Sequence, residues 1–135
     1  MKFNPLNCGI TGHTGVLGRE LIKKNKNLNF IKFKGDITKK NHIKKWLENN
    51  PIDIIVHLAA IVPTNIVEKK TSYANKVNYI GTKFLINEII KYNKIKWFFY
   101  SSTSHVYKFS KNKISENSTI KPTSKYGLTK LNGEK

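Results

Sequence analysis

The segment GITGHTGVLG at positions 9–18 limits what this chain of 135 residues can fold into more than any other segment. It follows a short apolar run at 6–11 and leads into residues 16–24, where apolar side chains recur at helical spacing. Its last three glycines lie three residues apart. Between a strand and a helix, such glycines permit a tight turn, approach of a ligand to the backbone, and close packing of helix on sheet. We therefore predict a strand–turn–helix unit whose turn binds the pyrophosphate of a dinucleotide at the start of the helix.

The rest of the chain alternates between short apolar runs and longer segments with helical spacing. Residues 30–34 alternate apolar and basic, as in a strand covered on one face, and residues 52–60 are almost continuously apolar, as in a strand buried on both faces. We also predict helices at 41–49 and 77–92, a strand at 97–102, a loop at 107–123 and a last helix from Lys125. Strands that alternate with helices pair in parallel, so we predict an α/β fold with a Rossmann-type, doubly wound parallel sheet.

An acidic residue, Asp36, lies at the end of the second predicted strand. A carboxylate at this place can accept hydrogen bonds from the hydroxyls of a ribose. The alternative is that Asp36 caps a helix that begins near Thr38, and the sequence does not decide between the two.

Two segments near the end of the chain predict a second part of the site. The segment SSTSHVY at 101–107 follows the last predicted strand, while Tyr126 and Lys130 lie four residues apart and would share one face of a helix. A lysine ammonium there lowers the pKa of the phenol, which would let Tyr126 act as a general acid or base. A hydroxyl from 101–107 could hold a substrate oxygen beside it. Because this spacing of Tyr and Lys is common, the pair indicates a catalytic site only in combination with the glycine turn earlier in the chain.

Six segments, in this order, resemble the extended short-chain dehydrogenase/reductase superfamily, in particular its sugar-nucleotide epimerases, dehydratases and dTDP-4-dehydrorhamnose-reductase-like members. They are TGHTGVLG at 11–18, GDIT at 35–38, HLAA at 57–60, VNYIGT at 77–82, SSTSHVY at 101–107 and PTSKYGLTKLNGE at 122–134. The resemblance implies a nicotinamide-dependent protein of nucleotide-sugar metabolism, with NAD or NADP as its cofactor and a nucleotide sugar as its substrate. Full-length members can form oligomers.

The resemblance also implies roles for single residues. The pyrophosphate would lie on the turn made by Gly12, His13, Thr14, Gly15, Val16, Leu17 and Gly18. Cofactor contacts elsewhere would come from Asp36 and Ile37 at the adenine and from Leu58, Ala59 and Ala60 on the path to the nicotinamide, with Asn78 supporting the active site. The catalytic set would be Thr103, Tyr126 and Lys130, with Tyr126 as the acid/base and Lys130 on the ribose of the nicotinamide; Ser102 and Ser104 are the alternative alignments for Thr103.

Several properties stay open. Only one strand is predicted between the first helix and Gly35, where family members often have two, so the residue that selects NAD or NADP is not identified; Lys32 or Lys34 could accept a 2′-phosphate. The chain ends soon after the Tyr-x-x-x-Lys helix begins, so we expect residues 1–135 to form one incomplete NAD(P)-binding Rossmann domain, truncated before its C-terminal strands and substrate region. Two interpretations follow: an epimerase, dehydratase or reductase with a Ser/Thr-Tyr-Lys site, or a dinucleotide-binding remnant without catalytic activity, so whether the chain is an enzyme is uncertain.

Composition argues against several other functions. The chain has 25 basic and 8 acidic residues, a net charge of +17, but Arg19 is the only arginine and the lysines are scattered, so we expect no specific nucleic-acid site. No apolar stretch is long enough to cross a membrane, no signal region follows the N-terminus, and the single Cys8 suggests a reducing compartment, so we expect a cytoplasmic protein. No Cys/His group has zinc spacing, and we expect no metal site. Of the other residues, we expect Cys8, Trp46 and Trp97 to pack in the core and His57 to be a core or cofactor-side residue.

Overall fold

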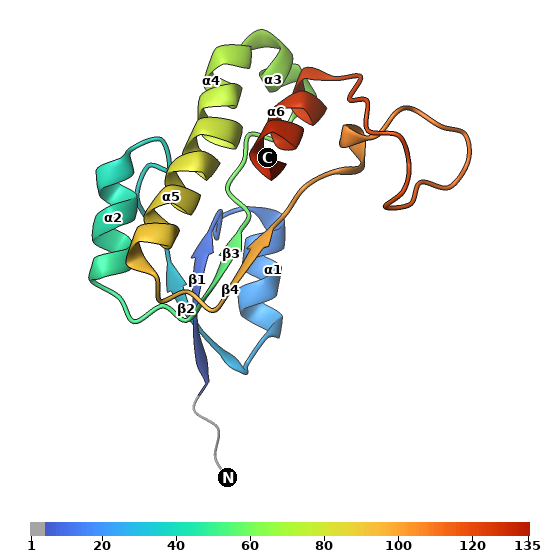
Figure 1. Ribbon diagram of the computed structural model, residues 1–135. Coiled ribbons are helices and arrows are strands. Elements are labelled where there is room, and N and C mark those ends of the chain that lie inside the picture. The colour runs from blue at the N-terminus through green and yellow to red at the C-terminus, as the bar shows by residue number, and fades with distance from the viewer. Residues whose placement is uncertain (1–4) are drawn as a thin grey trace. The chain divides into compact units, whose positions relative to one another are not determined.

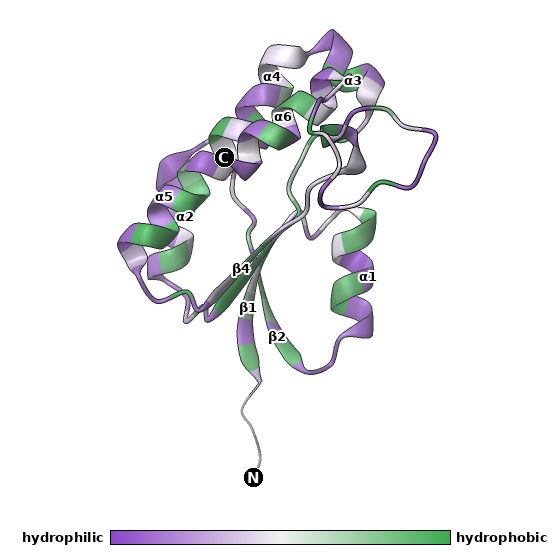
Figure 2. Cartoon of the chain, turned by 45° about the vertical axis from the view of Figure 1, so that its right-hand side comes forward, coloured by the Kyte–Doolittle hydropathy of each residue, from purple (hydrophilic) through white to green (hydrophobic). Residues whose placement is uncertain are grey.

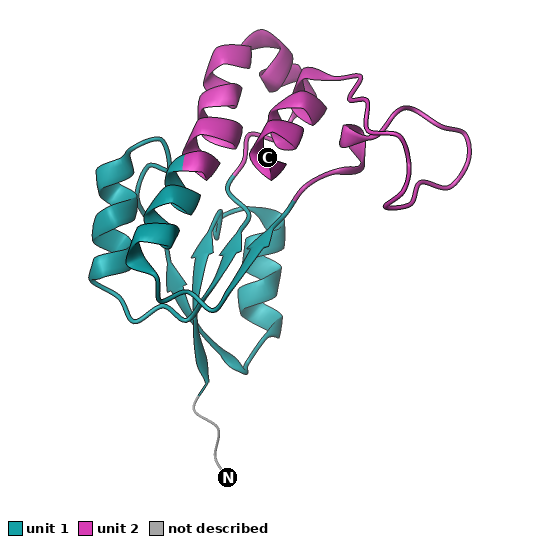
Figure 3. Cartoon of the chain, viewed as in Figure 1, with its two compact units in different colours: residues 1–59, 84–101 teal, residues 60–83, 102–135 magenta. Residues whose placement is uncertain are grey.

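A computed structural model of the chain describes residues 5–135, which form two compact units (Figure 3). Of the described residues, unit 1 comprises those up to residue 59 and residues 84–101, and unit 2 comprises residues 60–83 and 102–135. The chain therefore passes between the units after residues 59, 83 and 101.

Unit 1 contains a parallel sheet of four strands in the order β2-β1-β3-β4 (Figure 1). The strands are β1 (Leu6–Thr11), β2 (Leu28–Lys32), β3 (Ile54–His57) and β4 (Trp97–Tyr100). In the register of the sheet, Cys8 lies between Phe30 of β2 and Ile54 of β3. Since the chain runs from β1 to one edge and returns on the other side of β1 as β3, the carboxyl ends of β1 and β3 form the switch point where open α/β sheets bind ligands. The predicted α/β fold with a Rossmann-type parallel sheet is confirmed.

Helices cover both faces of this sheet, with α1 (Val16–Lys24) on one face and α2 (Lys40–Glu48) on the other, together with the part of α5 (Thr82–Tyr92) that belongs to unit 1 (Figures 1 and 2). The alternation of side chains along β1 explains why both faces are apolar. Cys8 and Ile10 belong, with Val56 of β3, to the cluster against which Leu21 and Ile22 of α1 pack. Gly9 points the other way, where an added Cβ would lie 2.8 Å from the ring of Trp46 in α2. The close approach of α2 to the sheet therefore depends on Gly9.

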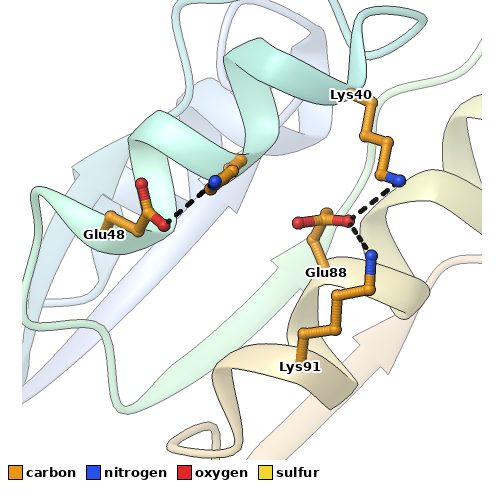
Figure 4. Close-up of polar contacts among 5 residues, drawn as sticks. Lys40, Glu48, Glu88 and Lys91 are labelled. Atoms are coloured by element: carbon orange, nitrogen blue, oxygen red, sulfur yellow. Dashed lines mark hydrogen bonds and ion pairs between the residues drawn. The ribbon is translucent and has the colours of Figure 1, made fainter.

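A buried carboxylate, Glu88, joins α5 to α2 within unit 1 (Figure 4). Its side chain is 7% exposed, and one of its oxygens lies 3.0 Å from Lys91 Nζ and 3.6 Å from Lys40 Nζ. The hydrogen bond from Lys91, helped by the charges of both lysines, holds the pKa of Glu88 below its ordinary value. Glu88 is thus kept ionised by its two partners.

Unit 2 is helical. Its elements are α3 (Thr64–Lys69), α4 (Thr71–Asn75), the π-helical stretch η1 (Lys76–Gly81), the 3₁₀ turn η2 (Ser104–Val106) and α6 (Lys125–Glu134). Val67, Ala74 and Tyr126 form its apolar cluster, with Ile61 packed against them. The predicted helix at 77–92 is therefore only part of a longer run that begins with α4 and passes through η1 into α5. Helix α6 packs against η1, η2 and α3.

The predicted boundaries hold residue for residue at β1 and α1 and within three residues at the other strands and at α2. The loop at 107–123 is also confirmed; an isolated antiparallel bridge joins Tyr107 to Ile120 within it. Cys8 and Trp46 are buried as expected, and burial raises the pKa of the Cys8 thiol to about 11. The expectation for Trp97 is wrong: it is 54% exposed and its ring stacks on that of Phe99. The reason is that β4 is an edge strand among the described residues, so one side of it is left uncovered.

In the part of the chain that the structure describes, no helix has the length and apolar character needed to cross a membrane. Within the same residues, no three side chains of His, Cys, Asp or Glu are grouped in a way that could hold a metal ion.

Candidate functional site

The turn after β1 has glycine at three positions, and the reason for a glycine differs among them. Gly12 has a φ of +71°, and a Cβ there would lie 2.6 Å from the backbone nitrogen of Ala59. A Cβ at Gly18 would lie 2.8 Å from the Cα of His13. At Gly15, by contrast, the nearest atom would be the Gly12 carbonyl oxygen at 3.4 Å, an ordinary contact. The fold itself therefore requires Gly12 and Gly18, while it leaves the space over Gly15 open.

The first turn of α1 can receive an anion. Gly15 is its N-cap residue, no side chain caps it, and it contains no acidic residue. Thr14, Gly15, Val16 and Leu17 are exposed. The first N–H groups of a helix have no partner within the helix, and the helix dipole adds partial positive charge, which suits a phosphate. Moreover, His13 Nδ1 is one of two buried side-chain nitrogen or oxygen atoms among the described residues without a hydrogen-bond partner.

Thr11 and His57 fix the ends of β1 and β3 beside this turn. Thr11 Oγ1 lies 2.6 Å from His57 Nδ1 and accepts a hydrogen bond from the Ala59 N–H at 3.2 Å. Both side chains are buried, and His57 also stacks on Tyr100. His57 is therefore a satisfied buried residue, as expected, and Ala59 of the predicted cofactor path is held beside the glycine turn. No sequence signal marks Thr11 as a site residue, because a threonine at the end of a strand is common.

Asp36 forms a local turn. Its Oδ1 accepts hydrogen bonds from both the backbone N–H and the hydroxyl of Thr38, each at 2.8 Å, and these bonds hold the pKa of Asp36 below its ordinary value. Helix α2 begins at Lys40 with Lys39 as its N-cap, so the alternative in which Asp36 caps that helix is wrong. Asp36 itself is exposed, whereas Ile37 is only 6% exposed and offers little surface to a ligand.

In unit 2, η2 and α6 bring Thr103 to Tyr126. Tyr126 and Lys130 lie on the buried side of α6, and are 9% and 3% exposed. Thr103 precedes η2, where its Oγ1 accepts a hydrogen bond from the His105 N–H at 3.3 Å, and its side chain also hydrogen-bonds to Tyr126. Ser102, one of the alternative alignments, instead donates its hydroxyl to Glu134. Thr103 is thus the hydroxyl residue that the structure joins to Tyr126.

Burial sets the pKa values of the two residues on α6. It raises the pKa of the Tyr126 phenol, and the hydrogen bond with Thr103 opposes this. Burial also lowers the pKa of Lys130 to about 8, against the opposing charge of Glu134. The expectation that the pKa of Tyr126 is lowered is therefore wrong, because the loss of water around the phenol raises it more than the hydrogen bond with Thr103 lowers it.

Asn78 supports α6 from η1. Its side chain is fully buried, accepts the Ile61 N–H at 2.7 Å, and donates to the Ile61 carbonyl and to Thr129 Oγ1, each at 3.0 Å. Thr129 in turn donates to the Tyr126 carbonyl at 2.8 Å. Asn78 therefore holds both α6 and the segment that follows Ala60. Sequence reasoning missed Thr129, although its position three residues after Tyr126 places both on one face of the helix.

Comparison with known proteins places these features in a family. Residues 7–135 match the family profile described as RmlD substrate binding domain. The chain is 29% identical over 135 residues to the dTDP-4-dehydrorhamnose reductase of Aggregatibacter actinomycetemcomitans, a match that covers 93% of this chain and 45% of that protein. It is 32% identical over 121 residues to the dTDP-D-glucose 4,6-dehydratase of Dictyostelium discoideum, covering 81% of this chain and 28% of that protein.

Solved structures give the same result. A dTDP-4-dehydrorhamnose reductase from Clostridium acetobutylicum is similar with a TM-score of 0.86 and 31% identity, over 96% of this chain and 48% of that one. A reductase of the same name from Bacillus anthracis, in complex with NADP, is similar with a TM-score of 0.90 and 24% identity, over 99% of this chain and 49% of that one. The chain therefore spans about half the length of these structures, and between about a quarter and a half of the curated relatives it matches.

Proposed function

The chain belongs to the RmlD substrate binding domain family, and on that premise we propose that it binds a nicotinamide dinucleotide, NAD or NADP, through the glycine turn. The observation that carries the proposal is Gly15. The packing of the chain does not require a glycine there, yet the position lies at the uncapped start of α1. A pyrophosphate that approaches the backbone at this position would explain why residue 15 has no side chain. The orphaned Nδ1 of His13 in the same turn adds a second polar group that a ligand could satisfy.

The test is a pair of substitutions at Gly15. Gly15→Val should abolish NAD(H) and NADP(H) binding, measured by calorimetric titration, because a branched side chain blocks the backbone from the pyrophosphate. Gly15→Ala should weaken binding less and leave the folded structure intact, since a Cβ fits there. Unchanged titration in a folded Gly15→Val protein would rule the assignment out.

We further propose that the protein acts on a nucleotide sugar, as a reductase, epimerase or dehydratase. Bound NAD(P) would supply hydride transfer. Tyr126 would give or take the proton of a substrate hydroxyl, Thr103 would orient that oxygen, and Lys130 would bind the ribose hydroxyls of the nicotinamide. The hydrogen bond between Thr103 and Tyr126 and the low pKa of Lys130 support this assignment.

The test compares Tyr126→Phe with the wild-type protein under conditions in which the wild type turns over a nucleotide sugar. Tyr126→Phe should keep its cofactor affinity and lose turnover by about 100-fold or more, because only the phenolic proton is removed. Thr103→Val should also lose turnover, while Ser104→Ala should not. Normal turnover in Tyr126→Phe, or an inactive Ser104→Ala, would show that the residues are assigned wrongly.

A second candidate is a dinucleotide-binding protein without turnover of its own. The observation that favours it is that the glycine turn and the uncapped start of α1 lie in unit 1, whereas Thr103, Tyr126 and Lys130 lie in unit 2. The two candidates differ in one measurement. The second requires cofactor binding by the 135-residue chain with no conversion of added nucleotide sugars, followed by chromatography of the sugars because epimerisation and dehydration leave the net amount of NAD(P)H unchanged.

A further inference from the structure

We propose that Gly127 is a positioning residue for Tyr126. Its missing side chain lets the first turn of α6 lie against the backbone of η2, and this contact holds the ring of Tyr126 against that of His105, two residues after Thr103. The importance of the contact rests on the role proposed for Tyr126. The contact itself lies within unit 2 and does not involve a cofactor.

Gly127 meets η2 backbone to backbone. A Cβ on Gly127 would lie 2.9 Å from the carbonyl carbon of His105, closer still to the carbonyl oxygen, and 3.2 Å from the His105 Cβ. Contacts under 3.0 Å with a backbone carbonyl are not relieved by a change of rotamer, so one of the two elements would have to move. Glycine also lowers helix stability relative to alanine, and this contact explains why a glycine occurs inside α6.

The residues on both sides of this contact carry the proposed chemistry. The Tyr126 ring packs edge-on against the His105 ring, with centroids 5.8 Å apart. Thr103 Oγ1 accepts the His105 N–H at 3.3 Å, and the hydrogen bond of the Thr103 side chain with Tyr126 lowers the pKa of the phenol. Ser124, the N-cap of α6, accepts the Gly127 N–H at 3.0 Å, and its Oγ lies 3.5 Å from His105 Nδ1. If α6 moved away from η2, the hydrogen bond between Thr103 and Tyr126 would therefore lengthen or break.

A role in packing alone predicts a different result. If Gly127 only allowed α6 to pack, its substitution would lower stability and leave the ionisation of Tyr126 unchanged. If Gly127 positions Tyr126, substitution also removes the hydrogen bond that stabilises the phenolate, and the pKa of Tyr126 rises.

The experiment measures the pKa of Tyr126 in the 135-residue chain by NMR of tyrosine labelled with ¹³C at Cζ. The signal is assigned among the six tyrosines by its absence from Tyr126→Phe. Thr103→Val should raise the pKa of Tyr126, Gly127→Ala should raise it by at least half as much, and the double variant should raise it no further than Thr103→Val alone. Gly133→Ala, a glycine replacement in the same helix, serves as the control and should leave the pKa unchanged.

An unchanged pKa of Tyr126 in folded Gly127→Ala, or additive shifts in the double variant, would overturn the proposal. If Gly127→Ala does not fold, Ser124→Ala answers the same question by removing the cap that bonds to the Gly127 N–H. It should raise the pKa, Ser124→Thr should restore it, and an unchanged pKa in Ser124→Ala would overturn the proposal. None of these measurements uses cofactor or substrate, so their outcome is separate from that of the titration and turnover experiments.

Discussion

The two units make their candidate sites from different parts of the polypeptide. In unit 1 the glycine turn offers mainly backbone groups, and the buried polar side chains nearest to it, Thr11 and His57, bond to each other. In unit 2 the site consists of side chains on α6 and of Thr103, the residue before η2. Its buried polar residues are Asn78, Thr82, Thr129 and Lys130. A site made of backbone depends on where side chains are absent, whereas a site made of side chains depends on how each buried polar group is satisfied.

This difference predicts different weaknesses. Unit 1 should be sensitive to any side chain added at a tight glycine, and tolerant of changes at the exposed residues of the turn. Unit 2 should be sensitive to pH, because burial moves the pKa values of Tyr126 and Lys130 in opposite directions.

The largest effect is expected for Gly12→Ala in unit 1. The positive φ and the overlap with Ala59 should together lower the free energy of unfolding by about 3 kcal/mol or more. Gly15→Ala, the matched control, should change it by less than about 1 kcal/mol. Urea denaturation followed by circular dichroism measures both. Equal losses in the two variants would remove the distinction between a glycine required by the fold and one kept for a ligand.

Lys130→Met in unit 2 is expected to stabilise the protein near neutral pH. The folded pKa of about 8 lies below the ordinary value of 10.5, so the folded state releases its proton first, and the stability of the wild-type chain should rise with pH between about 8 and 10.5. Below pH 8 the penalty for the buried charge is fully present, and its removal should yield up to about 3 kcal/mol. The difference between Lys130→Met and wild type should shrink as the pH rises through this window.

Denaturation at pH 7, 9 and 10.5 checks this expectation. Lys125→Met provides the control, since Lys125 is half-exposed and paired with Glu68 at the surface. A pH-independent difference between Lys130→Met and wild type would show that Lys130 does not titrate as described.

The smallest effect is expected for Glu88→Gln in unit 1. The lysine partners of Glu88 are more than half exposed, so the loss of charge should cost about 1 kcal/mol and less in high salt. Because the folded pKa of Glu88 is lowered, its contribution is present above the ordinary value of 4.5 and is lost as the pH falls through the folded pKa. Glu48→Gln, at an exposed pair with Lys44, should change stability by only a few tenths of a kcal/mol. An equal effect at both positions would mean that the burial of Glu88 adds nothing.

The sequence predicted unit 1 better than unit 2, for physical reasons. The glycine turn, β1 and α1 have local signals, namely glycine spacing and apolar periodicity, and their boundaries were predicted residue for residue. Helices α3 and α4 were missed because residues 64–75 contain few apolar residues at helical spacing. The helix predicted at 77–92 covers most of η1, but the π-helical geometry of η1 was not predicted, because its wider turn does not follow the 3.6-residue period.

The site shows the same pattern. The spacing of Tyr126 and Lys130 predicted that they share a helix face, but not the direction of the Tyr126 pKa, which depends on burial by residues distant in the sequence. The close contact of Gly127 with His105 could not be predicted either, because the two residues belong to segments that are separated in the sequence by the loop at 107–123.

Because of where the tryptophans lie, tryptophan fluorescence can distinguish changes in unit 1 from changes in unit 2. Both tryptophans of the chain, Trp46 and Trp97, lie in unit 1. Trp46 is buried beside Phe33, with an indole N–H that has no partner among the described residues, while Trp97 is more than half exposed. Indole emission moves to longer wavelength as water reaches the ring, so Trp46 should contribute the short-wavelength part of the spectrum and Trp97 the long-wavelength part. Opening of unit 1 should then appear as a red shift of the Trp46 component, while loosening of α6 alone should leave the tryptophan spectrum unchanged.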